Sequence, residues 1–108
     1  YDGCLGVLAG LEVVRTLYEN QLRLNHAIEV IVFTDEERSV IGSKGMAGEV
    51  VENPDYYVRL DGSPIQPCLE KVGGDWSEIS SAKRDRSDLA AFVELHVEQG
   101  GVLEHAQL

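Results

Sequence analysis

The stretch that decides the fold is AIEVIVFTDEER, residues 27–38, in which an apolar run leads directly into three consecutive acids. Only Glu29 interrupts the apolar residues of Ala27–Phe33, and such a run is typical of an interior strand that is covered on both faces. The carboxylates of Asp35, Glu36 and Glu37 repel one another at this strand end. They either form a solvated turn or face a positive charge that the sequence does not spell out.

A helix is predicted before this strand. Apolar residues recur at helical spacing from Gly3 to Gln21, and Asp2 stands where an N-cap residue belongs. A loop over Leu22–His26 then leads to the strand. A helix followed by a buried strand is typical of a layered α/β domain.

Short elements are predicted after the acidic turn, with Gly and Pro as their boundaries. They are a helix from Gly42 to about Glu52, a strand over Tyr56–Leu60, a loop over Asp61–Pro67, and a helix over Cys68–Val72 that stops at Gly73.

A strand with two unlike faces is predicted over Ala90–Val97. Apolar Val93, Leu95 and Val97 alternate with Glu94, His96 and Glu98, and alternating side chains point to opposite faces of a strand. One of the two glutamates could accept a hydrogen bond from His96; the alternative is that both are solvated. His105, in an expected terminal helix, and His26, in a loop, are interpreted as surface residues.

The composition of the sequence limits the classes of function that the protein can have. The 108 residues are 44% hydrophobic, which is ordinary for one globular α/β domain. Nine Lys and Arg against nineteen Asp and Glu give a formal net charge of −10, which argues against a nucleic-acid or anionic-membrane surface. The two cysteines, Cys4 and Cys68, lack metal-type spacing and are expected to be reduced thiols of a cytoplasmic protein.

Candidate metal ligands stand at the ends of the predicted elements. Asp2 begins a helix, Glu36 and Glu37 follow one strand, and His96 lies near the end of another. Ligands of open α/β sheets gather at the carboxyl ends of strands, and zinc accepts both carboxylate and imidazole. Spacing alone does not decide between a metal site and a solvated acidic turn.

Four motifs occur in the order in which a known family carries them. They are YDGCLGVLAGLEVVRTL (1–17), IEVIVFTDEE (28–37), IGSKGMAG (41–48) and ELHVEQGGVLE (94–104). Together they resemble the amidase, hydantoinase and carbamoylase group of the zinc-dependent exopeptidase superfamily, which includes N-carbamoyl-L-amino-acid hydrolases and allantoate amidohydrolases. The resemblance implies a three-layer α/β/α catalytic domain of the zinc-exopeptidase type, truncated here at both ends.

The resemblance also implies roles for four residues. Asp2 matches the family's bridging aspartate, Glu37 and His96 match further metal ligands, and Glu36 matches the general base. Two divalent metal ions (Zn, Mn, Co or Ni) are therefore expected, and their charge would explain why the chain tolerates the acidic turn. The family's two other metal histidines fall outside this sequence, and His105 does not replace either of them.

Residues 1–108 are accordingly expected to be part of a metal-binding catalytic domain, without the family's dimerisation domain. The expected function is hydrolysis of linear C–N bonds in N-carbamoyl-L-amino acids or a ureide, by an intact protein that is a homodimer, while the isolated segment is expected to be inactive. The alternatives are an allantoate amidohydrolase, a metallo-exopeptidase, and a non-catalytic remnant or interaction module.

Overall fold

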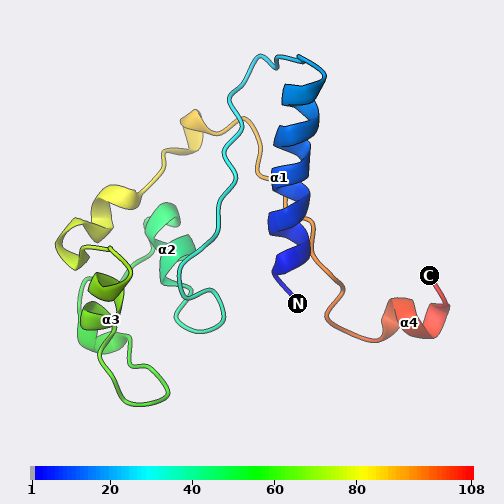
Figure 1. Ribbon diagram of the computed structural model, residues 1–108. Coiled ribbons are helices and arrows are strands. Elements are labelled where there is room, and N and C mark those ends of the chain that lie inside the picture. Colours follow the sequence, from blue (N-terminus) through cyan, green and yellow to red (C-terminus); the bar gives the residue numbers. More distant parts are fainter. Residues whose placement is uncertain (1) are drawn as a thin grey trace. The chain divides into compact units, whose positions relative to one another are not determined.

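The computed structural model describes residues 2–108, which form two compact units. One unit contains the residues up to Val32 together with Ala90–Leu108, and the other is Phe33–Leu89. The elements are the α-helices α1 (Cys4–Glu19), α2 (Ile41–Ala47), α3 (Ile65–Lys71) and α4 (Val102–Ala106), and the 3-10 helices η1 (Pro54–Tyr56), η2 (Trp76–Ala82) and η3 (Arg86–Asp88) (Figure 1).

Helix α1 confirms the first predicted helix, but Asp2 is not its N-cap. Gly3 occupies that position, and no side chain caps the helix start. At the other end, the Asn20 side chain donates to the carbonyl of Thr16 at 2.8 Å, and the chain leaves the helix through Gln21 at a φ of 55°. Its ion pairs, from Arg15 to Glu12 and Glu19, are exposed and add little stability.

Two glycines bring α1 close to the two segments that were predicted as strands. A Cβ atom at Gly6 would lie 2.5 Å from the carbonyl oxygen of Leu95, and one at Gly10 would lie 3.1 Å from a methyl group of Val30. Figure 1 shows the segment around Leu95, in orange, passing beside α1. Glycine at these positions therefore lets the helix contact both segments through its backbone.

The predicted strands themselves are not formed among residues 2–108, where the only bridge joins Val58 to Pro64. A strand is held by a ladder of hydrogen bonds to a neighbouring strand, and Ala27–Phe33 and Ala90–Val97 have no such ladder in this part of the chain. Val32 is 70% exposed and Val93 is 88% exposed. The interior strand expected over Ala27–Phe33 and the two-faced strand expected over Ala90–Val97 are therefore not formed within residues 2–108, and neither is the three-layer arrangement.

Helices α2 and α3 are displaced from their predicted bounds by their caps. Helix α2 ends before Gly48, at a φ of 73°, where the amide of Glu49 donates to the carbonyl of Lys44 at 2.9 Å; this closure stops the helix short of Glu52. Helix α3 begins earlier than predicted, at Ile65, and accommodates Pro67 in its first turn, where a missing N–H leaves no hydrogen bond unmade. The strand predicted over Tyr56–Leu60 is reduced to the bridge at Val58.

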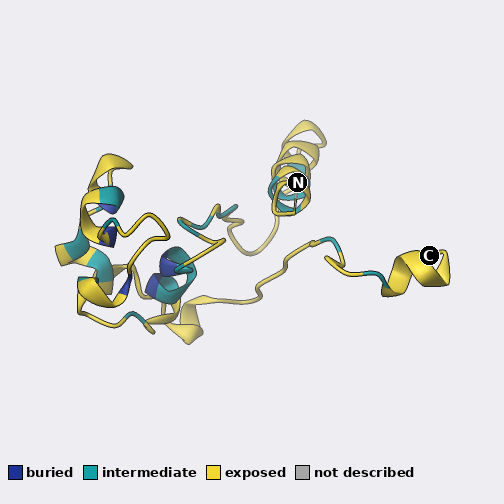
Figure 2. Cartoon of the chain, turned by 90° about the horizontal axis from the view of Figure 1, so that it is seen from below, coloured by how far each residue is buried: buried dark blue, intermediate teal, exposed yellow. Residues whose placement is uncertain are grey.

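A small core holds the unit Phe33–Leu89 together. Ile41, Tyr57 and Ile65 are buried against one another, with Trp76 and Ile79 packed around them. The Tyr57 hydroxyl accepts a hydrogen bond from the amide of Val51 at 2.8 Å, so the ring is buried without losing its polar partner. Among residues 2–108, Figure 2 shows buried residues, in dark blue, only in this unit.

Candidate functional site

The acidic turn is closed by its first acid. Asp35 adopts a φ of 52°, its carbonyl accepts from the amide of Val40 at 2.9 Å, and its carboxylate accepts from both the hydroxyl and the amide of Ser39. Asp35 is therefore a structural residue of the turn. Glu36 and Glu37 remain exposed.

Helix α2 fixes this turn against the end of the preceding segment. The amide of Gly42 donates to the carbonyl of Thr34 at 3.1 Å, and a Cβ atom at Gly42 would lie only 2.6 Å from the amide nitrogen of Thr34. The glycine of the IGSKGMAG motif thus permits a backbone contact that a side chain would prevent. It places the loop that carries Glu36 and Glu37 between two fixed points.

The backbone of Val40, which connects the acidic turn to α2, is strained. Its φ of 50° and ψ of 32° are left-handed, a conformation that is unfavourable for a β-branched residue. Its carbonyl accepts from the amide of Lys44 at 2.9 Å and from the hydroxyl of Ser43 at 3.0 Å, which hold it in place. Backbone strain of this kind is found at functional sites more often than elsewhere.

His96 presents one defined nitrogen. Its Nδ1 lies 2.7 Å from the carbonyl oxygen of Val97, and because a carbonyl only accepts, Nδ1 carries the proton. Nε2 is then the ring nitrogen that can offer a lone pair, and the side chain is exposed. A hydrogen bond from one ring nitrogen to a carbonyl is the usual support of a histidine that binds a metal through the other nitrogen.

Glu98 does not support His96. Its two carboxylate oxygens accept from the amides of Val102 and Leu103, each at 2.9 Å, and thereby cap α4. The idea that Glu98 orients the imidazole is therefore wrong in this structure, where a backbone carbonyl takes that role.

Asp2 has a partner that sequence reasoning did not find. The amide nitrogen Nε2 of Gln99 lies 3.4 Å from Oδ2 of Asp2, across 97 positions of sequence. The contact joins the first motif to the last, and it brings Asp2 near the segment that carries His96. The only signal in the sequence was that Gln99 lies in the same short motif as His96.

The four predicted site residues are divided between the two units. Asp2 and His96 belong to one, and Glu36 and Glu37 stand in the first turn of the other. No group of three or more His, Cys, Asp or Glu side chains within residues 2–108 is close enough to hold a metal ion. The convergence of Asp2, Glu37 and His96 therefore stays a prediction.

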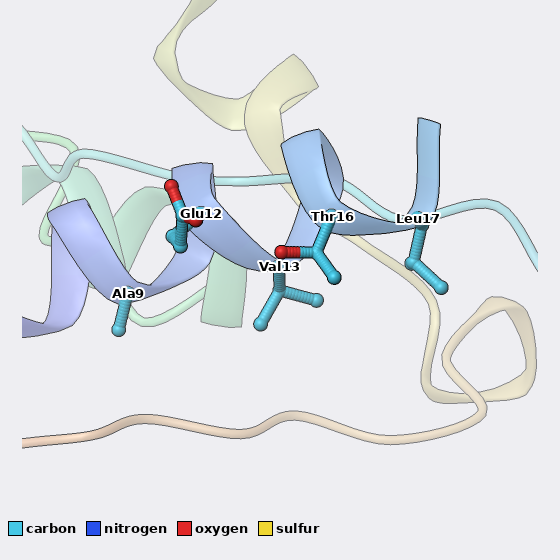
Figure 3. A pocket seen from close by; sticks show the side chains of 5 residues that line it. All are labelled: Ala9, Glu12, Val13, Thr16 and Leu17. Carbon is cyan, nitrogen blue, oxygen red and sulfur yellow. The ribbon is translucent and has the colours of Figure 1, made fainter. Parts of the chain in front are cut away.

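A shallow surface depression lies elsewhere, along α1. Figure 3 shows its lining side chains, all from that one helix: Ala9, Glu12, Val13, Thr16 and Leu17. It is an open, mostly apolar helix face and contains none of the four predicted site residues. Within residues 2–108, the helices lack the length and apolar character that a span of the bilayer requires.

Comparison with known proteins decides the family. A model of peptidase family M20/M25/M40 matches residues 1–108, the full length of the sequence. The chain belongs to this family. The resemblance predicted from the four motifs is thereby confirmed, and membership implies an α/β fold of the zinc-exopeptidase type.

Similar proteins have names that agree with the predicted group. An N-carbamoyl-L-amino acid amidohydrolase of Geobacillus stearothermophilus is 41% identical over 100% of this chain and 28% of its own length. An N-carbamoyl-L-amino-acid amidohydrolase of Paenarthrobacter aurescens is 34% identical over the same shares, and an allantoate deiminase of Arabidopsis thaliana is 30% identical over 96% of this chain and 22% of its own. The chain thus spans about a quarter of the length of these relatives.

Proposed function

We propose that this chain is part of a metal-dependent hydrolase that cleaves the linear C–N bond of N-carbamoyl-L-amino acids. The observation that carries the proposal is the 41% identity to an N-carbamoyl-L-amino acid amidohydrolase over the whole chain. The three-layer α/β/α domain is proposed to form when strands from the rest of a longer polypeptide pair with Ala27–Phe33 and Ala90–Val97.

Asp2, Glu37 and His96 are the proposed metal ligands, and their chemistry fits two divalent cations. Carboxylate oxygens and a neutral imidazole are donors that Zn, Mn, Co and Ni all accept. The hydrogen bond from Nδ1 of His96 to Val97 leaves Nε2 for a cation, and the exposed carboxylate of Glu37 is not used by the turn that carries it. Two bound cations would polarise the carbonyl of the substrate and lower the pKa of a water molecule.

Glu36 is the proposed general base. Its carboxylate accepts a proton from the water that attacks the carbonyl carbon and then donates this proton to the nitrogen that leaves, so that the C–N bond breaks without releasing a free amide anion. Asp35 cannot share this task while its carboxylate is bound to Ser39. Glu36 would thus transfer the proton, while its neighbour Glu37 would bind metal.

A second candidate substrate class is a ureide such as allantoate. The allantoate deiminase from Arabidopsis thaliana aligns with 96% of this chain, and the same four residues would serve that reaction. The carbamoyl amino acid is preferred because the identity to the carbamoyl relative is higher, 41% against 30%.

The same proposal includes the activity of the isolated segment, the oligomeric state and the location of the protein. The 108-residue segment alone is proposed to be inactive, because it carries only part of the ligand set. A homodimer is proposed on the resemblance alone. A reducing, cytoplasmic location is proposed because Cys4 and Cys68 are both free thiols.

Metal content and turnover of single variants test these assignments in the full-length polypeptide. Glu36→Gln is expected to retain the metal while turnover falls roughly 10²- to 10⁴-fold, because only the proton acceptor is lost. Glu37→Ala and His96→Ala are expected to lose bound metal. Glu49→Gln, at an exposed glutamate of the same unit, is the matched control and should change neither quantity.

Elemental analysis and a panel of N-carbamoyl-L-amino acids, their D-isomers, allantoate and dipeptides provide the measurements. Equal metal content and near-normal rates in all variants would refute the role assignment. Preferred turnover of dipeptides would replace the proposed substrate by a peptide.

A further inference from the structure

Asp61 and Gly62 form the tip of a tight turn in the unit Phe33–Leu89. The amide of Arg59 donates to the carbonyl of Ser63 at 3.1 Å, and the amide of Gly62 donates to the carbonyl of Arg59 at 2.9 Å. Gly62 has a φ of 76°, which glycine adopts without the steric cost that a side chain would bring. The backbone of the turn is therefore fixed, while Asp61 and Gly62 are both exposed to water.

An aspartate that precedes a glycine can react with its own backbone. The amide nitrogen of the glycine forms a bond to Cγ of the protonated carboxyl group, and the carboxyl hydroxyl leaves with the amide proton as water. The five-membered succinimide ring that results is opened by water at either of its two carbonyl carbons. Opening at the main-chain carbonyl carbon gives isoaspartate, so the sum is an isomerisation that consumes no other reactant.

The tip of this turn leaves room for such a ring. Gly62 presents no side chain to block the attack on Cγ of Asp61. Apart from its chain neighbours, no heavy atom of the described residues lies within 4 Å of the position that a Cβ atom of residue 62 would occupy. The sequence has one other Asp–Gly pair, Asp2–Gly3, which leads directly into α1.

Ser63 opposes this reaction by holding the carboxyl group in its ionised form. Its hydroxyl donates to Oδ1 of Asp61 at 2.5 Å, and its amide donates to the same atom at 2.9 Å. These two hydrogen bonds, followed by the charge of Arg59, lower the pKa of Asp61 below its ordinary value of 3.8. The Ser63 oxygen also lies 3.7 Å from Sγ of Cys68, a contact that ties Ser63 to α3. Because an ionised carboxylate has no hydroxyl to lose, the hydrogen bonds from Ser63 slow ring closure.

We propose that Asp61–Gly62 is a modification site of this protein, at which Asp61 isomerises to isoaspartate at a rate that Ser63 limits. The two parts of the proposal rest on different observations. The open Asp–Gly tip makes the reaction possible, and the two hydrogen bonds from Ser63 slow it. Neither part depends on a metal or on the proposed hydrolase activity.

The modification is expected to affect the core of the unit. The turn joins Tyr57 and Ile65, which are 5% and 3% exposed. Its ends are paired by the bridge between Val58 and Pro64. In isoaspartate the main chain runs through Cβ and Cγ, which adds one carbon to a turn whose ends are both fixed. Amide hydrogen exchange of α3 is therefore expected to be faster in the isomerised protein, and equal exchange would contradict this effect on the core.

The test is an incubation of the full-length polypeptide at constant pH and temperature, beside its Ser63→Ala and Ser63→Thr variants. Isoaspartate at Asp61 is quantified by peptide mapping with mass spectrometry, and methylation by a protein isoaspartate methyltransferase counts it independently. Ser63→Ala removes the hydroxyl donor and is expected to form isoaspartate about twofold to tenfold faster, the effect of one hydrogen bond of ordinary net strength. Ser63→Thr keeps the hydroxyl and is expected to retain the parent rate.

Two controls come from the same peptide maps. Ser77→Ala removes the equivalent hydroxyl donor from Asp75, which precedes Trp76 rather than a glycine, and is expected to produce no isoaspartate there. The rate at Asp2 should not respond to Ser63→Ala. A response at either control position would mean that the substitutions act through general unfolding, and it would overturn the role of Ser63.

Leu60→Gly separates the hydrogen bond from the flexibility of the turn. It loosens the backbone at a residue that is 77% exposed and leaves the Ser63 hydroxyl in place, so a smaller acceleration than in Ser63→Ala is expected. Equal acceleration in both variants, or an unchanged rate in Ser63→Ala, would overturn the role of Ser63. Absence of isoaspartate at Asp61 from the denatured polypeptide, in which no hydrogen bond protects the turn, would overturn the site itself.

Discussion

The two units of the chain are stabilised by different kinds of contact. In Phe33–Leu89, the buried side chains of Ile41, Tyr57 and Ile65 come from successive short segments and pack into one core. In the unit that contains α1, no described residue is buried, and the contacts that define it join Gly6 to Leu95 and Asp2 to Gln99 across the length of the sequence. The first unit has a core of its own, whereas the second offers apolar surface that a longer polypeptide can cover.

The largest expected effect on stability comes from truncating a core residue to alanine, and it is compared with the same truncation at a surface residue. Ile41→Ala removes a side chain that is 0% exposed and is expected to lower the free energy of opening of its unit by about 2–5 kcal/mol. Leu8→Ala, at a residue of α1 that is 64% exposed, is expected to change stability by less than about 0.5 kcal/mol. In the 108-residue chain, amide hydrogen exchange of α2 and α3 measures the effect of Ile41→Ala, and exchange of α1 measures the effect of Leu8→Ala.

Measuring the stability of Leu8→Ala in the full-length polypeptide extends the comparison of the two units. If other parts of the protein cover α1, Leu8→Ala becomes costly there while remaining neutral in the 108-residue chain. A large cost at Leu8 in the short chain itself would contradict the description of α1 as an exposed helix.

An intermediate effect is expected at Gly6. Gly6→Ala places a Cβ atom 2.5 Å from the Leu95 carbonyl oxygen, and such overpacking typically costs about 1–3 kcal/mol. Nuclear Overhauser effects between residue 6 and Leu95 are expected to disappear. Gly3→Ala is the control, because nothing lies within 4 Å of a Cβ atom at that position.

Helix propensity gives the opposite expectation for Gly6. Alanine is favoured over glycine inside a helix by about 1 kcal/mol, so a helix without the Leu95 contact would gain stability. Increased stability of Gly6→Ala with the contacts to Leu95 retained would therefore remove the structural reason for this glycine.

The spacing of apolar residues and the positions of glycines were sufficient to predict helices that local interactions determine. The apolar spacing of residues 3–21 predicted α1, and Gly73 was correctly placed after the end of α3. The end of α2 was misplaced because its Gly48 was not interpreted as a left-handed cap, although glycine is the residue that such a cap requires. Pro67 was assigned to a loop although proline is tolerated in the first turn of a helix.

The long-range features could not be predicted in the same way. The apolar run Ala27–Phe33 indicates a buried strand, but a strand exists only with a neighbour to pair with, and residues 2–108 do not supply one. At the candidate site, residue types and motifs predicted Asp2, Glu36, Glu37 and His96, and their convergence stays a prediction. The contact from Gln99 to Asp2, the proton on Nδ1 of His96 and the capping role of Glu98 depend on geometry that no periodicity expresses.

The smallest expected effect on stability comes from a hydrogen-bonded turn at Asp75, in the unit Phe33–Leu89. The Ser77 hydroxyl and amide donate to the Asp75 carboxylate and lower the pKa of Asp75 below its ordinary value of 3.8. Because the folded pKa lies below the unfolded one, this contribution to stability is present above about pH 4 and is lost as the pH falls through the folded pKa.

Ser77→Ala is expected to raise the pKa of Asp75 toward its ordinary value, as followed by the NMR titration of its carboxyl carbon, while the fold is unchanged. Asp61 is the matched reference, since its carboxylate accepts from the hydroxyl and amide of Ser63 in the same way, and its lowered pKa should not respond to the substitution at Ser77. An unchanged titration of Asp75 in Ser77→Ala would mean that this turn is not closed by its side chains. The local unit would then depend on the core around Ile41 alone, and its contrast with the α1 unit would rest on burial rather than on turn chemistry.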